Sequence, residues 1–220
     1  MVSYTHMDYI NEMLASCPVV TRQQAIRYLM KQYGTTETGL FDRSITRMVN
    51  TKMIWNEMVG ETELIRLIGL NNNNDAAMLD FPYAFELYLN YGASYSTCEV
   101  AKYPFTAQFF RAKKDNSTSK IEVAVYDCKG RNPTMHLAKE VYDTTVRTAE
   151  AFVIPKKSFQ STFCRILLIK NCTRGFLESD EFQYLRGVGF SLFFATMGYD
   201  KSLELVLKEA DVEEIWSRYR

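Results

Sequence analysis

The chain lacks an excess of charge of either sign, because 26 lysine and arginine residues are balanced by 26 aspartate and glutamate residues. This balance argues against a protein that coats nucleic acid or lies on a membrane surface through charge alone, although a local basic face is compatible with a neutral total. A secretory signal is also missing, since polar and acidic residues interrupt residues 1–16. We therefore expect a cytoplasmic protein with no membrane partner.

The sequence also has few histidines and no closely spaced pair of cysteines. His6 and His136 are the only histidines, and the five cysteines contain no C-x-x-C motif. Neither histidine lies at metal-ligand spacing from a cysteine, so the sequence predicts no metal site and no cofactor. The odd number of scattered cysteines indicates free thiols rather than a disulfide framework.

Apolar side chains are abundant: they make up 47% of the 220 residues, which suffices for a sizeable core. A chain of this length forms one large or two modest domains, at about 100–200 residues per domain. The four consecutive asparagines at residues 71–74 favour a turn, because asparagine side chains compete for local backbone hydrogen bonds. We predict two domains, residues 1–70 and residues 75–220.

The clearest local pattern lies in the first third of the chain. Thr21 and Gln24 have the spacing of a capping box, so a helix should begin there, and Gly34 should end it. An earlier apolar run of helical spacing ends at Pro18. Residues 40–52 predict a third helix, and two short strands with a tight connection follow. This order of helices and hairpin is that of a winged helix-turn-helix domain.

The predicted third helix has two faces. Ile45, Met48 and Val49 recur at the spacing of a buried face. The opposite face carries polar side chains that can touch phosphates and bases, namely Arg43, Ser44, Arg47, Asn50, Thr51 and Lys52. We expect this face to bind double-stranded DNA, with the helix in the major groove and the hairpin on the backbone.

Acidic side chains close to this face leave an alternative open. They are Asp42 in the helix and Glu57, Glu61 and Glu63 in the hairpin. A strong grip on phosphate normally shows as a basic patch, and small helix-turn-helix units also dimerise or dock other proteins. The alternative is therefore a protein-interaction module, or a homodimer, without DNA binding.

The second half alternates predicted helices and strands. They are a helix over residues 75–91, strands over residues 97–103, 105–112 and 120–126, a helix over residues 134–152, a strand over residues 164–170, a short helix over residues 179–186, a strand over residues 190–196 and a closing helix from residue 200. Residues 164–170 are almost continuously apolar, as in a strand buried on both faces, so we expect them at the centre of a sheet. The fold class predicted for the whole chain is α+β.

The order of elements in this second half resembles the core of the restriction-endonuclease-like fold. With a winged helix in front of it, most of the chain resembles the replication-relaxation family of plasmid and conjugative-element proteins. The resemblance rests on architecture and on three segments, which are Tyr103-Pro104, Val125-Tyr126-Asp127 and the strand from Arg165 to Ile169. It implies a DNA-binding protein of a mobile element that acts in replication, mobilisation or regulation.

A nuclease of that fold needs several carboxylates to hold Mg²⁺ and a lysine near the scissile phosphate. Asp127-Cys128-Lys129 is a D-x-K sequence, and Glu86 could add a second acid. Gln108, however, stands where the second strand would need an acid. We therefore predict no enzymatic activity and expect Asp127 and Lys129 to lie in a turn or to pair with each other. An Mg²⁺-dependent nuclease is the second alternative.

Overall fold

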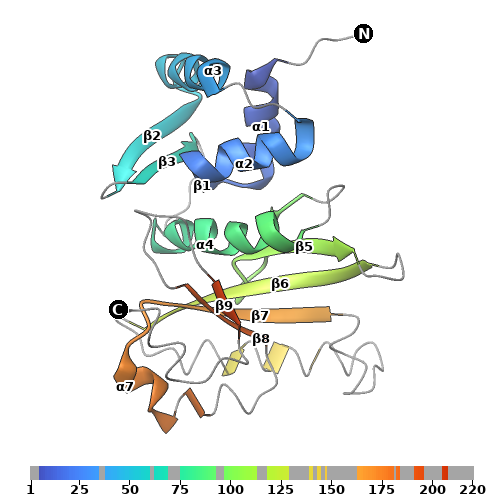
Figure 1. Ribbon diagram of the computed structural model, residues 1–220, viewed down its shortest axis with the longest axis vertical. Helices are drawn as coiled ribbons and strands as arrows, with labels where there is room; N and C mark the ends of the chain where they lie inside the picture. Colours follow the sequence, from blue (N-terminus) through green and yellow to red (C-terminus); the bar gives the residue numbers. More distant parts are fainter. Residues whose placement is uncertain are drawn as a thin grey trace.

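The computed structural model describes residues 5–34, 38–59, 62–68, 75–92, 97–112, 118–128, 139–140, 143–144, 147, 163–180, 182–183, 191–195 and 205–207. It is a mixed α and β structure with two sheets, in agreement with the predicted α+β class. The smaller sheet and three helices form one end of the molecule, and the larger sheet lies beyond a fourth helix (Figure 1). Within the described residues, no helix combines the length and the apolar composition needed to cross a lipid bilayer.

The N-terminal end is built from short elements in a fixed order. They are α1 (His6–Ser16), β1 (Val19–Thr21), α2 (Arg22–Tyr33), α3 (Thr38–Asn50), β2 (Ile54–Val59) and β3 (Thr62–Leu67). The strands form an antiparallel sheet in the order β1-β3-β2. The capping box at the start of α2 is confirmed, since Thr21 Oγ1 accepts from the Gln24 N–H and Gln24 Oε1 accepts from the Thr21 N–H. Gly34 ends α2 with a φ of 67°, a conformation that glycine adopts without steric cost.

The second half is organised around a six-stranded sheet. Its elements are α4 (Asp75–Tyr91), β4 (Glu99–Val100), β5 (Ala107–Ala112), β6 (Thr118–Asp127), β7 (Phe163–Lys170), α7 (Arg174–Leu177), β8 (Ser191–Ala195) and β9 (Leu205–Leu207). The strand order is β4-β5-β6-β7-β8-β9, with parallel pairing of β7 to both of its neighbours and antiparallel pairing elsewhere. The central position predicted for the apolar strand is confirmed, because residues 165–169 of β7 are all buried.

Two predictions for the second half were wrong. The closing helix expected from residue 200 is contradicted at Leu205–Leu207, which form β9 and pair with β8. The open edge of β8 offers backbone hydrogen bonds to an apolar segment, and this pairing outweighs a weak helical periodicity. Strand β4 is also far shorter than expected.

Two other predicted helices are only partly described. Ser179 was expected to cap a short helix, and Ser179 Oγ accepts from the Phe182 N–H at 3.2 Å. Helix α7, which begins at Arg174, was not predicted. The helix predicted over residues 134–152, with His136, lies largely outside the described residues, as do Lys129 and residues 69–74.

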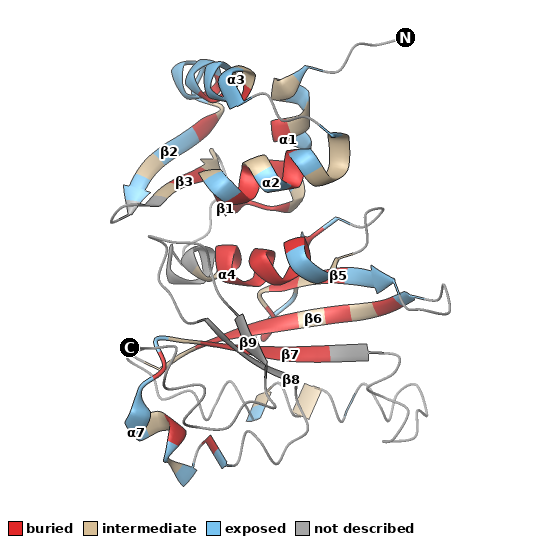
Figure 2. Ribbon diagram, viewed as in Figure 1, coloured by how far each residue is buried: buried red, intermediate tan, exposed pale blue. Residues whose placement is uncertain are grey.

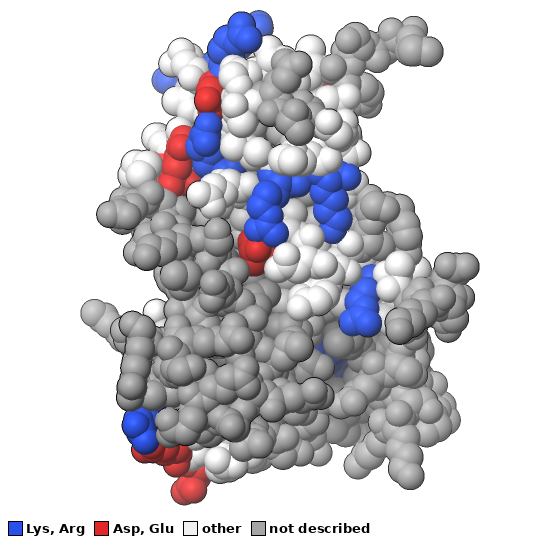
Figure 3. Space-filling view, viewed as in Figure 1, with Lys and Arg blue, Asp and Glu red and all other residues white. Residues whose placement is uncertain are grey.

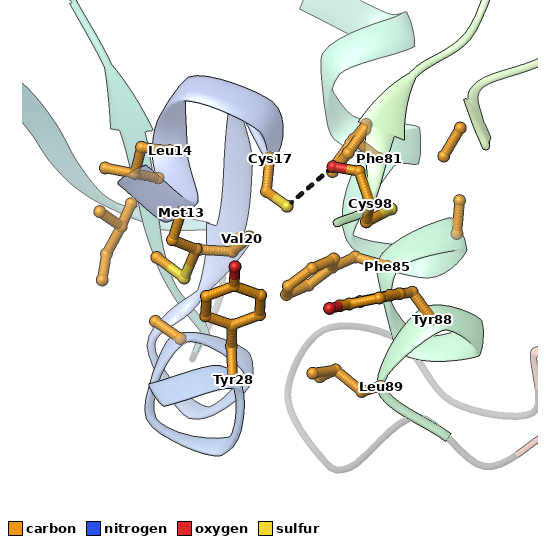
Figure 4. Close-up of a cluster of buried hydrophobic side chains, with 14 of the residues drawn as sticks. Met13, Leu14, Cys17, Val20, Tyr28, Phe81, Phe85, Tyr88, Leu89 and Cys98 are labelled. Atoms are coloured by element: carbon orange, nitrogen blue, oxygen red, sulfur yellow. Dashed lines mark hydrogen bonds between the residues drawn. The ribbon is translucent and has the colours of Figure 1, made fainter. Parts of the chain in front are cut away.

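Helix α4 is packed on both sides and joins the two halves. Every residue from Phe81 to Leu89 is buried, which requires apolar neighbours all around the helix (Figure 2). On one side, the Tyr28 ring of α2 lies 6.0 Å from the Phe85 ring and 6.2 Å from the Tyr88 ring (Figure 4). On the other side, Tyr88 contacts Phe109 of β5 edge to face at 5.6 Å. One hydrophobic core therefore extends from α1 and α2 through α4 to the large sheet.

Polar contacts fix the orientation of α2 on α4. Lys31 Nζ donates to the carbonyl oxygens of Tyr88, Leu89 and Gly92, at 3.3, 3.2 and 2.9 Å. These carbonyls belong to the last turn of α4 or follow it, where the helix dipole attracts a cation, and the Tyr88 carbonyl also accepts from the Gly92 N–H at 2.7 Å. The N-terminal unit is thus held on α4 by directional contacts as well as by apolar packing.

Candidate nucleic-acid interface

Helix α3 packs on the N-terminal core through one stripe. Phe41, Ile45 and Met48 are buried and follow each other at i, i+4 and i+7. Ile45 and Met48 were predicted correctly, whereas Val49 was expected inward and is 36% exposed. Val49 lies beside the buried stripe rather than on it. The third buried residue of the stripe is Phe41.

The opposite face of α3 points to solvent. Of the residues predicted to bind DNA, Arg43, Arg47, Asn50, Thr51 and Lys52 are exposed and Ser44 is half-buried at the edge of the face. A shallow hollow of about 390 Å³ follows this face and is lined by Asp42, Arg43, Thr46, Arg47, Asn50 and Thr51. Sequence reasoning missed Thr46, although its position three residues after Arg43 and four before Asn50 places it in the middle of the face. Ser44 and Lys52 do not line the hollow.

Hydrogen bonds within the helix fix several side chains of this face. Thr46 Oγ1 donates to the Asp42 carbonyl at 2.9 Å, and Thr51 Oγ1 donates to the Arg47 carbonyl at 3.0 Å. Arg43 Nε donates to the Gly39 carbonyl at 3.2 Å. Both threonine hydroxyls therefore use their single hydrogen inside the helix and present a methyl group and oxygen lone pairs outward.

Lys52 ends α3 in the left-handed region, with a φ of 56°. The Lys52 N–H donates to the Val49 carbonyl at 2.9 Å, and the Met53 N–H donates to the Met48 carbonyl at 2.8 Å. These two bonds form a Schellman motif, in which glycine is the usual residue at this position. A lysine here projects its charge from the end of the helix, where the following hairpin begins.

Three of the four acidic residues that argue against DNA binding are paired inside the N-terminal unit, and the fourth, Glu61, lies outside the described residues. Arg22 of α2 lies 2.5 Å from the Asp42 carboxylate and 3.5 Å from that of Glu63. Arg66 of β3 lies 3.8 Å from the Glu57 carboxylate. Among the described residues, neither Arg43, Arg47 nor Lys52 forms an ion pair. These pairings could not be predicted from the sequence because the paired residues lie on different elements. Figure 3 shows basic side chains with acidic ones beside them at the end of the molecule that carries α3.

A second polar cluster lies where β6 and β7 end. Lys170 forms ion pairs with Asp80 of α4 and, at 3.3 Å, with Asp127 of β6. The Asn171 amide donates to the Asp127 carboxylate at 2.8 Å. Burial raises the pKa of Asp80 above its ordinary value, more than the attraction of Lys170 lowers it.

This arrangement corrects one expectation about a nuclease site, the contribution of Glu86, whereas the pairing of Asp127 with Lys129 stays a prediction because Lys129 lies outside the described residues. Asp127 pairs with Lys170, the residue beside it on the parallel strand, and the acid contributed by α4 is Asp80. Glu86 instead lies against α2, with 2.5 Å between its carboxylate and Arg27. A lysine between two carboxylates neutralises much of the negative charge that would attract a divalent cation. Within the part of the chain that the structure describes, no group of three or more metal-ligating side chains is present.

Neither a family model, nor a curated protein, nor a solved structure significantly matches this chain. The resemblance to the replication-relaxation family thus stays a prediction from the order of elements.

Proposed function

We propose that the protein binds double-stranded DNA, with α3 in the major groove and the β2–β3 hairpin beside the phosphate backbone. The observation that carries the proposal is the contrast on α3: its basic side chains are exposed and outside any described ion pair, while the neighbouring Asp42 is neutralised by Arg22. The order of helices and strands and the sheet order β1-β3-β2 are compatible with a winged helix-turn-helix domain and support the proposal.

The polar groups of α3 suit both parts of a duplex. A helix fits the major groove, where arginine and asparagine side chains match the hydrogen-bonding edges of guanine and adenine. Lys52, at the end of α3, can reach phosphate while Arg43, Arg47 and Asn50 face the bases. The resemblance in element order favours a role in replication, mobilisation or regulation of a mobile element in the cytoplasm. In this proposal the larger α/β domain, of restriction-endonuclease-like topology, serves assembly rather than catalysis.

One observation favours a protein-interaction module instead. Trp55 and Met58 of β2 are 55% and 63% exposed, and large apolar side chains on a hairpin are common in protein interfaces. The two functions differ in their response to salt, because phosphate contacts release counterions and apolar contacts do not.

The test is fluorescence anisotropy with a labelled duplex of random sequence over a range of salt concentrations. The double variant Arg43→Ala/Arg47→Ala should bind more weakly, and the slope of log affinity against log salt should fall, because two positive charges are removed from the interface. The matched control is Lys102→Ala/Arg111→Ala, which removes two exposed basic residues from the other half of the molecule. If the wild-type protein binds no duplex in a salt-sensitive way, the protein-interaction function replaces this proposal.

A further inference from the structure

Arg43 is the arginine of the α3 face whose side chain is held in place by its own helix. Its Nε donates to the Gly39 carbonyl, one turn earlier, at 3.2 Å. A guanidinium group carries five N–H hydrogens in one plane, and this bond uses only the hydrogen on Nε. The two terminal amino groups of Arg43 are left on the exposed side of the helix. The guanidinium plane is therefore oriented before any ligand arrives.

We infer that Arg43 is the specificity-determining residue of α3 and recognises a guanine through its O6 and N7 atoms. The inference rests on the proposed DNA-binding function and adds that the exposed face of α3 selects guanine. Guanine is the base whose major-groove edge presents two adjacent acceptors, and an arginine with two free amino groups donates to both at once. A preoriented side chain loses less conformational entropy on binding than a mobile one.

The position of Arg43 along α3 also favours base contact. In helix-turn-helix domains the N-terminal part of the recognition helix approaches the base edges. Arg43 lies in the first half of α3 (Thr38–Asn50), whereas Arg47 lies in its last turn. A Cβ atom added at Gly39 would meet, among the described residues, no side chain and no backbone from outside its own turn within 4 Å, so these residues leave room beside the start of the helix.

The neighbours of Arg43 on α3 neither donate to a guanine in its place nor bind its guanidinium group. Thr46 uses its hydroxyl hydrogen on the Asp42 carbonyl, so it offers a methyl group and an acceptor but no donor. Asp42 is turned to Arg22, which keeps its carboxylate from competing for the Arg43 guanidinium. The terminal amino groups of Arg43 are thus available to donate to the O6 and N7 atoms of a guanine.

The experiment begins with selection of preferred duplexes from a randomised library by the wild-type protein. Each guanine of the selected duplex is then replaced in turn by 7-deazaguanine, which lacks the N7 acceptor. We expect one such replacement to weaken wild-type binding by roughly tenfold or more, as for loss of a bidentate contact. Arg43→Lys should discriminate less between the parent and the replaced duplex, because one ammonium group replaces the two coplanar donors of the guanidinium. Its salt slope should match that of the wild type, because its charge is unchanged.

Arg47→Lys is the matched control and should still distinguish the two duplexes. Selection without a preferred guanine, or an Arg43→Lys variant that retains the wild-type discrimination, would overturn the assignment of Arg43 while DNA binding stands. Absence of any salt-sensitive binding by the wild-type protein would instead overturn the proposed function itself. Circular dichroism of both variants verifies that the exposed substitutions leave the fold unchanged.

Discussion

Arg22, the first residue of α2, and Asp42, on α3, form an ion pair with 2.5 Å between Nη2 and Oδ1. The same guanidinium lies 3.5 Å from Glu63 on β3 and over the Phe41 ring at 5.7 Å. One arginine therefore compensates two acids at the border of the proposed DNA-binding face. Because the pair is half-exposed, its value lies less in stability than in the charge that α3 presents to a ligand.

Replacing Arg22 should show whether it neutralises the Asp42 carboxylate beside the proposed DNA-binding face. In Arg22→Gln the Asp42 carboxylate stands uncompensated beside Arg43, and we expect duplex affinity to fall several-fold at low salt, equivalent to about 1 kcal/mol. Adding Asp42→Asn should restore most of the loss. The measurement is duplex anisotropy for the two single variants and the double variant. Equal affinities for wild type and Arg22→Gln would mean that Asp42 does not influence the face.

Gln24 connects the capping of α2 to its contact with α4. Its Nε2 donates to the Pro82 carbonyl at 2.7 Å and to Glu86 Oε2 at 3.1 Å, while its Oε1 accepts within the capping box. Gln24→Ala removes all three bonds at a buried position, so we expect a loss of about 1–3 kcal/mol in the free energy of unfolding. The control is the exposed neighbour Gln23, whose change to alanine should cost less than about 0.5 kcal/mol. Urea denaturation measures both, and equal midpoints would contradict the proposed role of Gln24.

The shared core predicts that the two halves unfold together. Phe85 is fully buried and contacts the Tyr28 ring on one side of α4 and the Tyr88 ring at 5.4 Å along it. Phe85→Ala should lower stability by about 3–5 kcal/mol and shift both halves alike. The fluorescence of Trp55 in a Trp216→Phe background reports the N-terminal half, and far-UV circular dichroism reports the whole chain. Two separate transitions in the wild type would show that the halves fold independently.

Local patterns gave the correct result where the deciding contacts are near in sequence. Thr21 and Gln24 cap α2 as their spacing indicates, and the apolar run of β7 lies at the sheet centre. Contacts between residues distant in sequence could not be predicted. Leu205–Leu207 form a strand because they pair with the edge of β8. Asp127 forms an ion pair with Lys170 because β6 and β7 are parallel and place the two residues side by side. The neutral overall charge likewise concealed the pairing of Asp42 with Arg22, which the sequence places 20 residues apart.

Lys52 allows stability and DNA binding to be separated. At its φ of 56°, a side chain costs about 1 kcal/mol relative to glycine. Lys52→Gly should therefore raise the free energy of unfolding by about that amount, while Lys52→Ala should not. Both variants lose the same charge and should weaken duplex binding equally, each lowering the salt slope by about one unit. Different affinities for the two variants would show that the conformation of this residue, and not its charge, affects binding.

The Asp80, Lys170 and Asp127 cluster should affect stability in alkali. Burial alone would lower the pKa of Lys170, but the attraction of Asp80 and Asp127 outweighs it, so this pKa lies above its ordinary value of 10.5. The folded state thus holds the lysine proton more tightly than the unfolded chain. The resulting stabilisation is fully present below pH 10.5 and is lost as the pH rises through the folded-state pKa.

Lys170→Met removes this group, so its urea midpoint should fall less steeply above pH 10.5 than that of the wild type. Tyrosines add a decline of their own, since burial, followed by the hydrogen bond to Glu12, raises the pKa of Tyr33 to about 12. That decline is common to both proteins, so their difference isolates the lysine. Lys102→Met, at an exposed position, should follow the wild-type curve. Parallel curves for wild type and Lys170→Met would mean that the two aspartates do not hold the lysine proton in solution.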